Sequence, residues 1–233
     1  TLRLRGTVGE PINPEVWKWY FNVIGKKRCP IIDTWWQTET GGMMISSLPG
    51  IESNFLKPGS ATQPVPGVSI SVVDEDGKEV PANTKGSLII ENPWPGMLMT
   101  LWNDDEKYKD VYWSKFENKY YPGDYAIRDS DGYFWLLGRS DDVLKVAGHR
   151  IGTAELESSL VSHDYVAESA VCSIPDEIKG ESIIAFVVLN DGIEITQEKL
   201  VNELRNTVRN SVGAIAIPQE FYIVSKLPKT RSG

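Results

Sequence analysis

One stretch of the sequence, residues 30–42, constrains the fold of this chain more than any other. It begins with the apolar run Pro30-Ile31-Ile32, which is typical of a buried strand. The next ten residues combine two indoles with carboxyl, amide and hydroxyl groups, and they are Asp33-Thr34-Trp35-Trp36-Gln37-Thr38-Glu39-Thr40-Gly41-Gly42. Such a mixture contributes little to a core, whereas a site for a polar ligand of several parts uses all of it. We therefore expect a strand that leads into a binding loop.

A helix is predicted before this strand. Asn13 followed by Pro14 is typical of a helix start, and Gly25 is typical of a helix end. The face that we expect to pack in the core carries Trp17, Tyr20, Phe21 and Ile24. With a further strand expected in residues 1–12, the order strand–helix–strand predicts an α/β layer over residues 1–56.

Residues 57–140 are predicted to form strands instead. Apolar residues alternate over 68–72, a further strand is expected at 86–90, and residues 125–136 are typical of a hairpin. The charged residues 103–109 favour a surface turn or helix. We expect a β-barrel-like subdomain or a curved sheet in this part of the chain.

Residues 141–233 are predicted to form a separate, small α+β domain. Helices are expected to begin at Thr153 and Thr196, because a threonine side chain can cap a helix start. The strands are expected over residues 143–146, 166–174, 183–189 and 221–224.

Composition excludes several classes of partner. The chain is 41% hydrophobic and 24% charged, as globular proteins are, and its net charge of −8 disfavours nucleic acid or an anionic membrane as main partner. It has no apolar run of about 18 residues, so no membrane span is expected. Cys29 and Cys172 lie far apart and are interpreted as reduced thiols of a cytoplasmic protein. We expect small-molecule substrates and allow for a homo-oligomer.

Six motifs occur in an order typical of one enzyme family. Besides the loop at 33–42 they are Gly9-Glu10-Pro11, Tyr121-Pro122-Gly123-Asp124, Gly138-Arg139-Ser140-Asp141-Asp142, Gly148-His149-Arg150 and Pro228-Lys229-Thr230-Arg231-Ser232-Gly233. In these motifs the chain resembles the AMP-forming acyl-CoA synthetases, and most closely the acetyl-CoA synthetases. The resemblance implies a ligase that joins acetate to AMP from ATP and then passes the acetyl group to coenzyme A.

The resemblance also implies a division of the chain. Residues 1–140 would be the C-terminal part of a large AMP-binding domain, and residues 141–233 a small mobile domain. The hinge between them would lie near Asp141.

The resemblance assigns most of the nucleotide site to the first half of the chain. The walls around adenine and the α-phosphate would be formed by Gly9, Glu10, Pro11, Asp33, Thr34, Trp35, Trp36 and Gln37. Thr38 would direct a hydroxyl at phosphate, and Glu39 would hold Mg²⁺, a hard cation that prefers oxygen. Without the resemblance, residues 9–11 would be interpreted as an ordinary turn.

Asp124 and Arg139 are the candidates for binding ribose. A carboxylate accepts hydrogen bonds from two neighbouring hydroxyls at once, and a guanidinium suits both ribose and phosphate. From the residues alone Asp124 is equally well a turn-capping aspartate, and Arg139 a solvated surface charge. The resemblance favours the binding roles.

Trp36 is the candidate for setting the size of the acid. The resemblance implies that its indole closes the acyl pocket, so that acetate fits and longer chains do not. The alternative is that Trp36 only packs. A propionyl-CoA synthetase or another short-chain acyl-CoA synthetase on the same scaffold also stays open, as does a non-catalytic nucleotide-binding module.

The thioester-forming step is assigned to the second half of the chain. The resemblance implies that Ala147 and Gly148 approach coenzyme A, that Arg209 meets one of its phosphates and that Arg150 contacts the outer phosphates of ATP. Close relatives often have serine at the position of Ala147, so a hydroxyl contact there is in doubt. For Arg209 a solvated charge is a serious alternative.

A second metal site is implied around His163. The resemblance places a metal between this imidazole and the main-chain carbonyls of Val161 and Val166. A lone histidine is more often a structural or surface residue than a ligand.

Two expected features fall outside these 233 residues. The family's phosphate loop would precede Thr1, and its catalytic lysine would follow Gly233, since its motif continues with lysine at that point. Lys229 stands too early in the motif to replace it. We therefore expect a piece of a longer chain that by itself does not form the adenylate.

Overall fold

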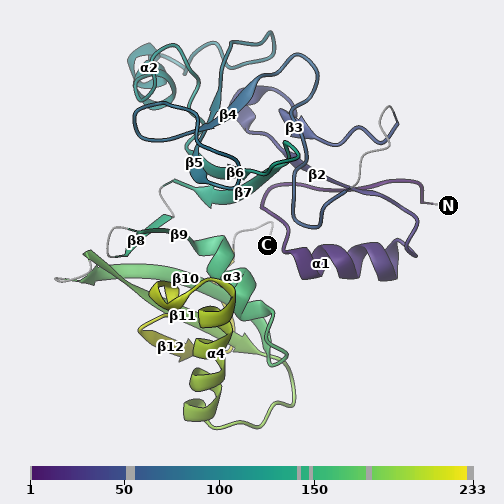
Figure 1. Cartoon of the computed structure of the whole chain (residues 1–233), viewed down its shortest axis with the longest axis vertical. Helices are drawn as coiled ribbons and strands as arrows, with labels where there is room; N and C mark the ends of the chain where they lie inside the picture. The colour runs from purple at the N-terminus through teal and green to yellow at the C-terminus, as the bar shows by residue number, and fades with distance from the viewer. Residues whose placement is uncertain (1, 51–55, 141–142, 147–148, 177–179, 230–233) are drawn as a thin grey trace. The chain divides into compact units, whose positions relative to one another are not determined.

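The computed structural model describes residues 2–50, 56–140, 143–146, 149–176, 180–229 (Figure 1). The chain divides into two compact units, Thr1–Asp141 and Asp142–Gly233. Asp141, the expected hinge, lies outside the described residues. Each unit is described by itself below.

The first unit begins with a small sheet whose first two strands run parallel. β1 (Arg5–Thr7) pairs with β2 (Ile31–Trp35), and β2 pairs antiparallel with β3 (Ile45–Ser46). Inward and outward residues alternate along β2, as a half-buried strand requires. The expected binding loop is wrong in one respect, because its first three residues still belong to β2. The parallel pairing is possible because a helical crossover joins the two strands.

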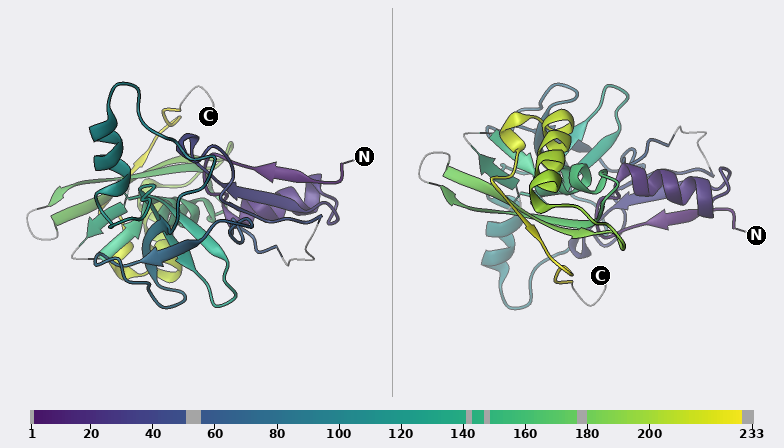
Figure 2. Two further views of the ribbon diagram at one scale, coloured as in Figure 1. Left: turned by 90° about the horizontal axis from the view of Figure 1, so that it is seen from above. Right: turned by 90° about the horizontal axis from the view of Figure 1, so that it is seen from below.

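This crossover is α1 (Pro14–Trp19) followed by a π-helical segment, η1 (Tyr20–Ile24), and it lies alongside β1 and β2 (Figure 2). The predicted start is confirmed, since Asn13 Oδ1 accepts the backbone N–H groups of Glu15 and Val16. The predicted buried face is wrong, because Trp17 is buried but Ile24 is 43% exposed. The π turn changes the number of residues per turn, so an α-helical pattern no longer keeps one face together.

A buried arginine holds this crossover against the sheet. Arg5 Nη1 donates to the carbonyl of Tyr20 at 2.6 Å, and Arg5 Nη2 donates to that of Cys29 at 3.1 Å. Gly25 makes room for the guanidinium, since a Cβ at this position would lie 1.9 Å from Arg5 Nη2. The end of the helix is therefore fixed by a side chain from β1.

The second sheet of this unit has the antiparallel order β4-β5-β6-β7. Its strands are β4 (Ile70–Val73), β5 (Lys85–Ile90), β6 (Asp124–Arg128) and β7 (Phe134–Arg139). The strands match the predicted pattern, but the expected barrel is wrong, because β4 and β7 are edges of an open sheet among the described residues. Trp35, Ile45, Leu88, Tyr120 and Phe134 share one buried cluster that joins the two sheets.

A short helix, α2 (Asp105–Trp113), connects β5 and β6. Asp104 caps it by accepting the backbone N–H of Lys107, and Asp105 and Glu106 favour its positive N-terminus. It contributes Tyr112 and Trp113 to the edge of the buried cluster.

The second unit is a mixed sheet covered by two helices. Its strands are β8 (Val143–Val146), β9 (His149–Gly152), β10 (Val166–Asp176), β11 (Gly180–Leu189) and β12 (Glu220–Ile223). The order is β10-β11-β8-β9, and β12 pairs parallel with β11. The sequence did not predict β9, a short strand that closes a hairpin with β8.

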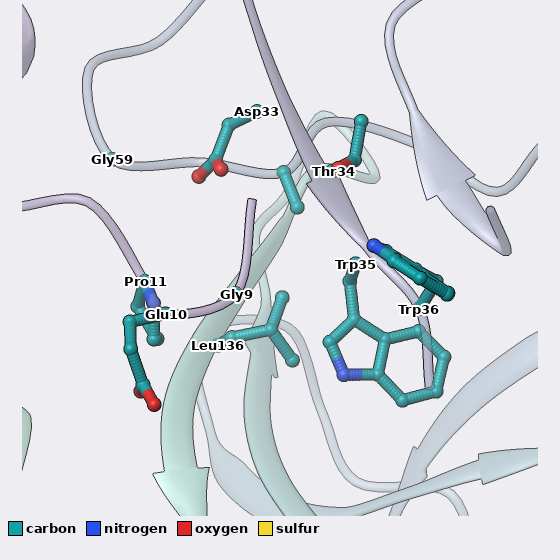
Figure 3. Close-up of a pocket in the computed structure, with 10 residues that line it drawn as sticks. Gly9, Glu10, Pro11, Asp33, Thr34, Trp35, Trp36, Gly59 and Leu136 are labelled. Atoms are coloured by element: carbon teal, nitrogen blue, oxygen red, sulfur yellow. The ribbon is translucent and has the colours of Figure 1, made fainter. Parts of the chain in front are cut away.

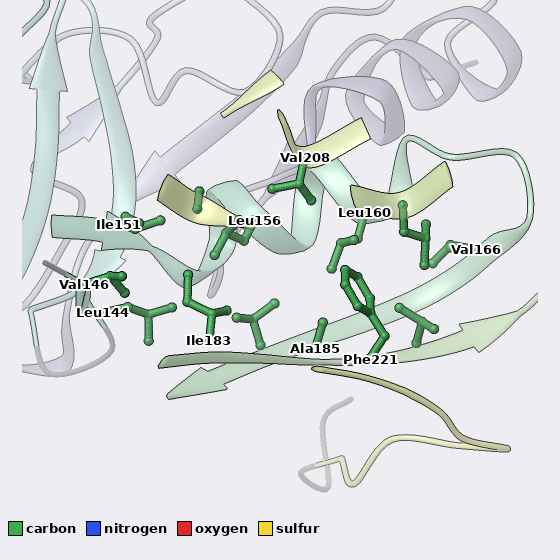
Figure 4. Packing of buried hydrophobic residues seen from close by; sticks show 14 of the residues in the cluster. Leu144, Val146, Ile151, Leu156, Leu160, Val166, Ile183, Ala185, Val208 and Phe221 are labelled. Atoms are coloured by element: carbon green, nitrogen blue, oxygen red, sulfur yellow. The ribbon is translucent and has the colours of Figure 1, made fainter. Parts of the chain in front are cut away.

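The helices are α3 (Thr153–Val161) and α4 (Gln197–Ser211), with a short helical turn, η3 (Ala214–Ala216), after them. Leu156 and Leu160 of α3 and Val208 of α4 pack on Ile183 and Ala185 of the sheet (Figure 4). The prediction of a Thr153 cap is wrong by one residue, since Gly152 is the N-cap. Thr196 does take the N-cap position of α4. Among the described residues, no helix has the length and apolar character that a bilayer crossing requires.

Candidate functional site

The loops that follow β1 and β2 meet at one edge of the first sheet. Because the two strands are parallel, their carboxyl ends point the same way, and such edges are where α/β proteins bind ligands. A solvent-open hollow lies there, and it is lined by Gly9, Glu10, Pro11, Asp33, Thr34, Trp35, Trp36, Gly59, Ala61 and Leu136 (Figure 3). The parallel register therefore brings two separately predicted motifs together.

Asp33 is the buried acid of this hollow. The residue is 5% exposed, and its Oδ1 accepts a hydrogen bond of 2.8 Å from the Thr7 hydroxyl. Burial disfavours the charged form and raises the pKa of Asp33 to about 6, although the bonds from Thr7 and the Thr34 backbone act in the opposite direction. Near neutral pH the hollow therefore contains a carboxylate close to its titration range.

The two indoles differ in environment. Trp35 is 8% exposed and belongs to the buried cluster, whereas Trp36 is 46% exposed. Both line the hollow, and Leu136 lies near the Trp35 ring (Figure 3). Glu10 also lines the hollow, but its carboxylate points away from Asp33 (Figure 3). Trp36 can thus close against a ligand, while Trp35 is already occupied in packing.

Asp124, at the start of β6, is held by donors from the β2 loop. Trp35 Nε1 and Gln37 Nε2 each donate to Asp124 Oδ2 at 3.2 Å. Gln37 Nε2 also donates to the carbonyl of Pro122 at 2.9 Å. Asp124 as a residue is 8% exposed, and these hydrogen bonds orient its carboxylate.

Arg139, at the end of β7, faces Asp124 across the hairpin register. Its Nη1 lies 3.5 Å from Asp124 Oδ1 and donates to the carbonyl of Pro122 at 2.6 Å. Gly123 permits this approach, since its φ is +80° and a Cβ there would lie 2.6 Å from Arg139 Nη2. An oriented carboxylate beside a guanidinium is an arrangement that can receive ribose hydroxyls and a phosphate.

Thr38 and Glu39 lie on a short helical turn, η2 (Thr38–Thr40), after β2. Thr38 is exposed and Glu39 half-buried. Glu39 Oε1 accepts a 2.6 Å hydrogen bond from the Tyr112 hydroxyl. Burial, followed by this bond to a carboxylate, raises the pKa of Tyr112 to about 12, so the hydroxyl stays protonated and donating.

A magnesium ion would find one protein carboxylate here. Within the described part of the chain no group of three or more His, Cys, Asp or Glu side chains could hold a metal. Mg²⁺ usually keeps several waters and takes one or two carboxylates together with substrate phosphates. Glu39, with one oxygen engaged by Tyr112, fits such a partial site.

The structure does not place all predicted residues around one hollow. Asp124, Arg139, Gln37, Thr38 and Glu39 do not line the hollow that contains Trp36. The hydrogen bonds of Asp124 to Trp35 and Gln37 connect it to the same β2 loop. The predicted residues of this unit therefore form a connected strip rather than one cavity.

The second unit contains the remaining candidates. His163 Nδ1 accepts the backbone N–H of Tyr165 at 3.3 Å, and its Nε2 lies 3.4 Å from Glu203 Oε2. Val161 ends α3, and Val166 begins β10 with its N–H donated to the carbonyl of His163. Arg209 is exposed in the last turn of α4.

Some predicted residues lie outside what the structure describes. Ala147 and Gly148 are among them, as is Asp141. Arg150 has its backbone in β9, but its side chain is not described. Their assigned roles stay predictions.

Sequence reasoning missed the tyrosines that support Glu39 and Gln37. Tyr112 and Tyr120 stack with ring centroids 5.4 Å apart, and the Tyr120 hydroxyl donates to Gln37 Oε1 at 3.2 Å. The signal available was the spacing of Tyr108 and Tyr112, which puts both on one face of a helix. Nothing in the spacing indicates that this face meets residue 39.

Comparison with known proteins gives two family matches. The family described as AMP-binding enzyme matches residues 1–102, and the AMP-binding enzyme C-terminal domain matches residues 155–233. Over all 233 residues the chain is 54% identical to an acetyl-coenzyme A synthetase of Pyrobaculum arsenaticum and to one of Chlorobaculum tepidum. The chain spans 35% of the length of each of these relatives.

Solved structures show the same likeness. The anthranilate CoA ligase AuaEII in complex with anthranoyl-AMP matches with a TM-score of 0.84 and 31% identity, over 100% of this chain and 42% of that one. The ATP-bound RpMatB-BxBclM chimera B1 matches with a TM-score of 0.82 and 27% identity, over 100% of this chain and 43% of that one.

Proposed function

We propose that this chain, which belongs to the family of AMP-binding enzymes, is part of an acetate–CoA ligase that forms AMP. An acetate oxygen attacks the α-phosphorus of ATP, giving acetyl-AMP and releasing pyrophosphate. The thiol of coenzyme A then attacks the acetyl carbon, giving acetyl-CoA and releasing AMP. One observation carries this proposal: the 54% identity to acetyl-coenzyme A synthetases extends over all 233 residues.

The first half-reaction uses residues 9–11 after β1, the segment 33–39 at the end of β2 and after it, Asp124 at the start of β6 and Arg139 at the end of β7. The loop at residues 9–11 and the segment 33–37 hold adenine and the α-phosphate beside the hollow. Asp124 accepts the ribose hydroxyls, because its carboxylate is already oriented by Trp35 and Gln37. Arg139 neutralises nearby phosphate charge and holds Asp124 from the other side.

Thr38 and Glu39 face the phosphates in this proposal. Magnesium supplies charge neutralisation for the reacting phosphates when bound, and Glu39 is the residue of this chain that holds it. Thr38 donates its exposed hydroxyl to a phosphate oxygen. Arg150 contributes a further positive charge to the outer phosphates.

The second half-reaction uses the second unit. Ala147 and Gly148 approach the pantetheine arm of coenzyme A, and Arg209, exposed at the end of α4, meets one of its phosphates. A movement about Asp141 would exchange the two sets of residues between the half-reactions. His163, with the carbonyls of Val161 and Val166, is a candidate structural metal site in this unit.

Trp36 restricts the acid to acetate. Its indole is the half-exposed ring that lines the hollow, so it can cover a short acyl group and occupy the volume a longer one needs. A propionyl-CoA synthetase is the second candidate. An apolar pocket distinguishes two acids that differ by one methylene by only about 10–200-fold in kcat/KM.

The experiment uses the full-length protein with ATP, Mg²⁺, coenzyme A and one acid at a time. The proposal expects AMP, pyrophosphate and acetyl-CoA in equal amounts, with kcat/KM for acetate above that for propionate and far above that for butyrate. Formation of ADP and phosphate would contradict it, and so would pyrophosphate release that does not depend on any acid. A higher kcat/KM for propionate would favour the second candidate.

A further inference from the structure

Tyr112 of α2 meets Glu39 of η2 although 73 positions separate them in the sequence. The phenol hydroxyl donates to Glu39 Oε1 at 2.6 Å, within the range of strong, charge-assisted bonds. The bond engages one oxygen of the carboxylate and so restricts the side chain that carries it.

The ring of Tyr112 is itself held in place. It stacks on Tyr120 with centroids 5.4 Å apart and planes 5° from parallel. Tyr120 is fully buried, packs edge-on against Trp94 and donates its hydroxyl to Gln37 Oε1. The Tyr112 hydroxyl is therefore a donor at a fixed position.

The backbone that carries Glu39 is held by the segment before α2. The N–H of Leu98 donates to the Glu39 carbonyl at 2.7 Å, and Trp94 Nε1 donates to the Thr40 carbonyl at 2.7 Å. The Tyr108 hydroxyl donates to the Leu98 carbonyl at 2.7 Å. Both the main chain and the side chain of Glu39 are thus fixed by residues 94–112, a segment in which the sequence indicated no site.

We propose that Tyr112 is a positioning residue, which holds one oxygen of Glu39 and so presents the other to the magnesium ion of the bound nucleotide. The inference rests on the proposed function, which makes Glu39 the ligand of that ion. A glutamate on a three-residue turn has several side-chain rotamers, and each rotamer lost before binding lowers the cost of binding. Tyr112 supplies this preorganisation without touching the nucleotide.

Calorimetry on the full-length protein with Tyr112→Phe tests the inference. The variant keeps the stacked ring and loses only the hydroxyl. Three titrations are compared: MgATP, ATP in EDTA, and AMP. We expect the Kd for MgATP to rise about 3- to 10-fold, the range for one long side chain that is no longer held before binding, while the other two change less than about twofold.

Tyr222→Phe is the matched control. Tyr222 also donates to a glutamate, Glu220, and also stacks on an aromatic ring, Phe186, but it lies in β12 of the second unit. It should leave all three affinities unchanged. A Tyr112→Phe protein that binds MgATP as tightly as wild type overturns the inference. Equal losses for all three ligands overturn it as well, because the tyrosine would then support the fold in general.

Combining Tyr112→Phe with Glu39→Gln tests whether Tyr112 acts through Glu39. In a Glu39→Gln protein, removing the Tyr112 hydroxyl should weaken MgATP binding no further, and an additional loss equal to that in wild type would contradict the inference. The titrations are independent of acid activation. If the wild type releases no acid-dependent pyrophosphate, the proposed function fails, whereas the Mg²⁺-specific effect of Tyr112→Phe is still measured.

Discussion

Trp35 Nε1 donates to Asp124 Oδ2 at 3.2 Å, which joins the end of β2 to the start of β6. Trp35 is a core residue of the first unit, and Asp124 is the carboxylate that we propose binds ribose. One side chain thus belongs to the packing and also orients the site. The orientation of the Asp124 carboxylate therefore depends on the packing of the core around Trp35.

The role of Asp124 is tested by Asp124→Asn in the full-length protein. We expect the affinity for AMP to fall about 10- to 100-fold, because hydrogen bonds to a charged acceptor contribute roughly 1.5–3 kcal/mol. The measurement is calorimetric, and 2′,3′-dideoxy-AMP is the control ligand, because it lacks the hydroxyls that Asp124 accepts. The same loss with both ligands would show that the substitution only distorts the site.

The role of Trp36 is tested by Trp36→Gly. Its indole is 46% exposed, so we expect little loss of stability, while kcat/KM for butyrate rises relative to acetate by about 10-fold or more. The physical reason is the volume freed beside the hollow. Trp102→Gly, which removes an indole that is 91% exposed and does not line the hollow, is the control. An unaltered acid profile in Trp36→Gly would leave Trp36 a packing residue.

Alanine substitutions at Gly41 and Gly42, the two neighbouring glycines after Glu39, are expected to differ in their effect on stability. Gly41 has φ of +69°, and a Cβ there would lie 2.0 Å from the carbonyl oxygen of Gly96, whereas a Cβ on Gly42 meets nothing within 4 Å. Gly41→Ala should therefore lower the free energy of unfolding by at least about 2 kcal/mol and impair acid activation. Gly42→Ala should change it by less than about 0.5 kcal/mol. Thermal unfolding of both variants measures this difference. Similar melting temperatures for the two variants would contradict the close packing of residues 41 and 96.

Asp33 predicts a pH-dependent stability. Its pKa rises from 3.8 to about 6 on folding, so the folded state binds the extra proton between these values. The contribution of Asp33 to the free energy of unfolding is therefore greatest below pH 4. It falls as the pH rises towards 6 and is constant above pH 6. A shift of about two units corresponds to roughly 3 kcal/mol.

The variant Asp33→Asn removes this titration while keeping an oxygen for the Thr7 hydroxyl. We expect it to be more stable than wild type at pH 7 by about 2 kcal/mol, with a smaller difference at pH 4.5. Urea unfolding at both pH values gives the comparison. Thr7→Val, which removes the donor instead, should be less stable than wild type at pH 7. A constant difference between Asp33→Asn and wild type across pH would contradict a raised pKa of Asp33 in the folded state.

Local patterns in the sequence predicted most elements correctly for physical reasons that can be named. A short apolar run predicted β2, alternation of apolar residues predicted β4, and Thr196 predicted the start of α4. The Asn13 cap could be predicted because a helix cap depends only on the side chain of the capping residue and on the turn that follows it.

Features that depend on residues distant in the sequence could not be predicted from local patterns. The π-helical end of the first crossover is bonded at the Tyr20 carbonyl by Arg5, a residue of β1. The sheet of the first unit stays open at β4 and β7, and strand patterns do not say whether edges join. The support of Glu39 by Tyr112 requires a contact over 73 positions, which no local period encodes. The candidate motifs were identified from the sequence, but their mutual geometry was not.

Acetate-dependent exchange between ATP and labelled pyrophosphate, measured on the full-length protein without coenzyme A, is the most direct test of an adenylate site in this chain. It reports the first half-reaction alone, because exchange requires reversible formation of acetyl-AMP. The account predicts exchange that needs acetate and Mg²⁺ and that falls at least about 10-fold in Asp124→Asn. Wild-type protein that binds MgATP but shows no acetate-dependent exchange would contradict it.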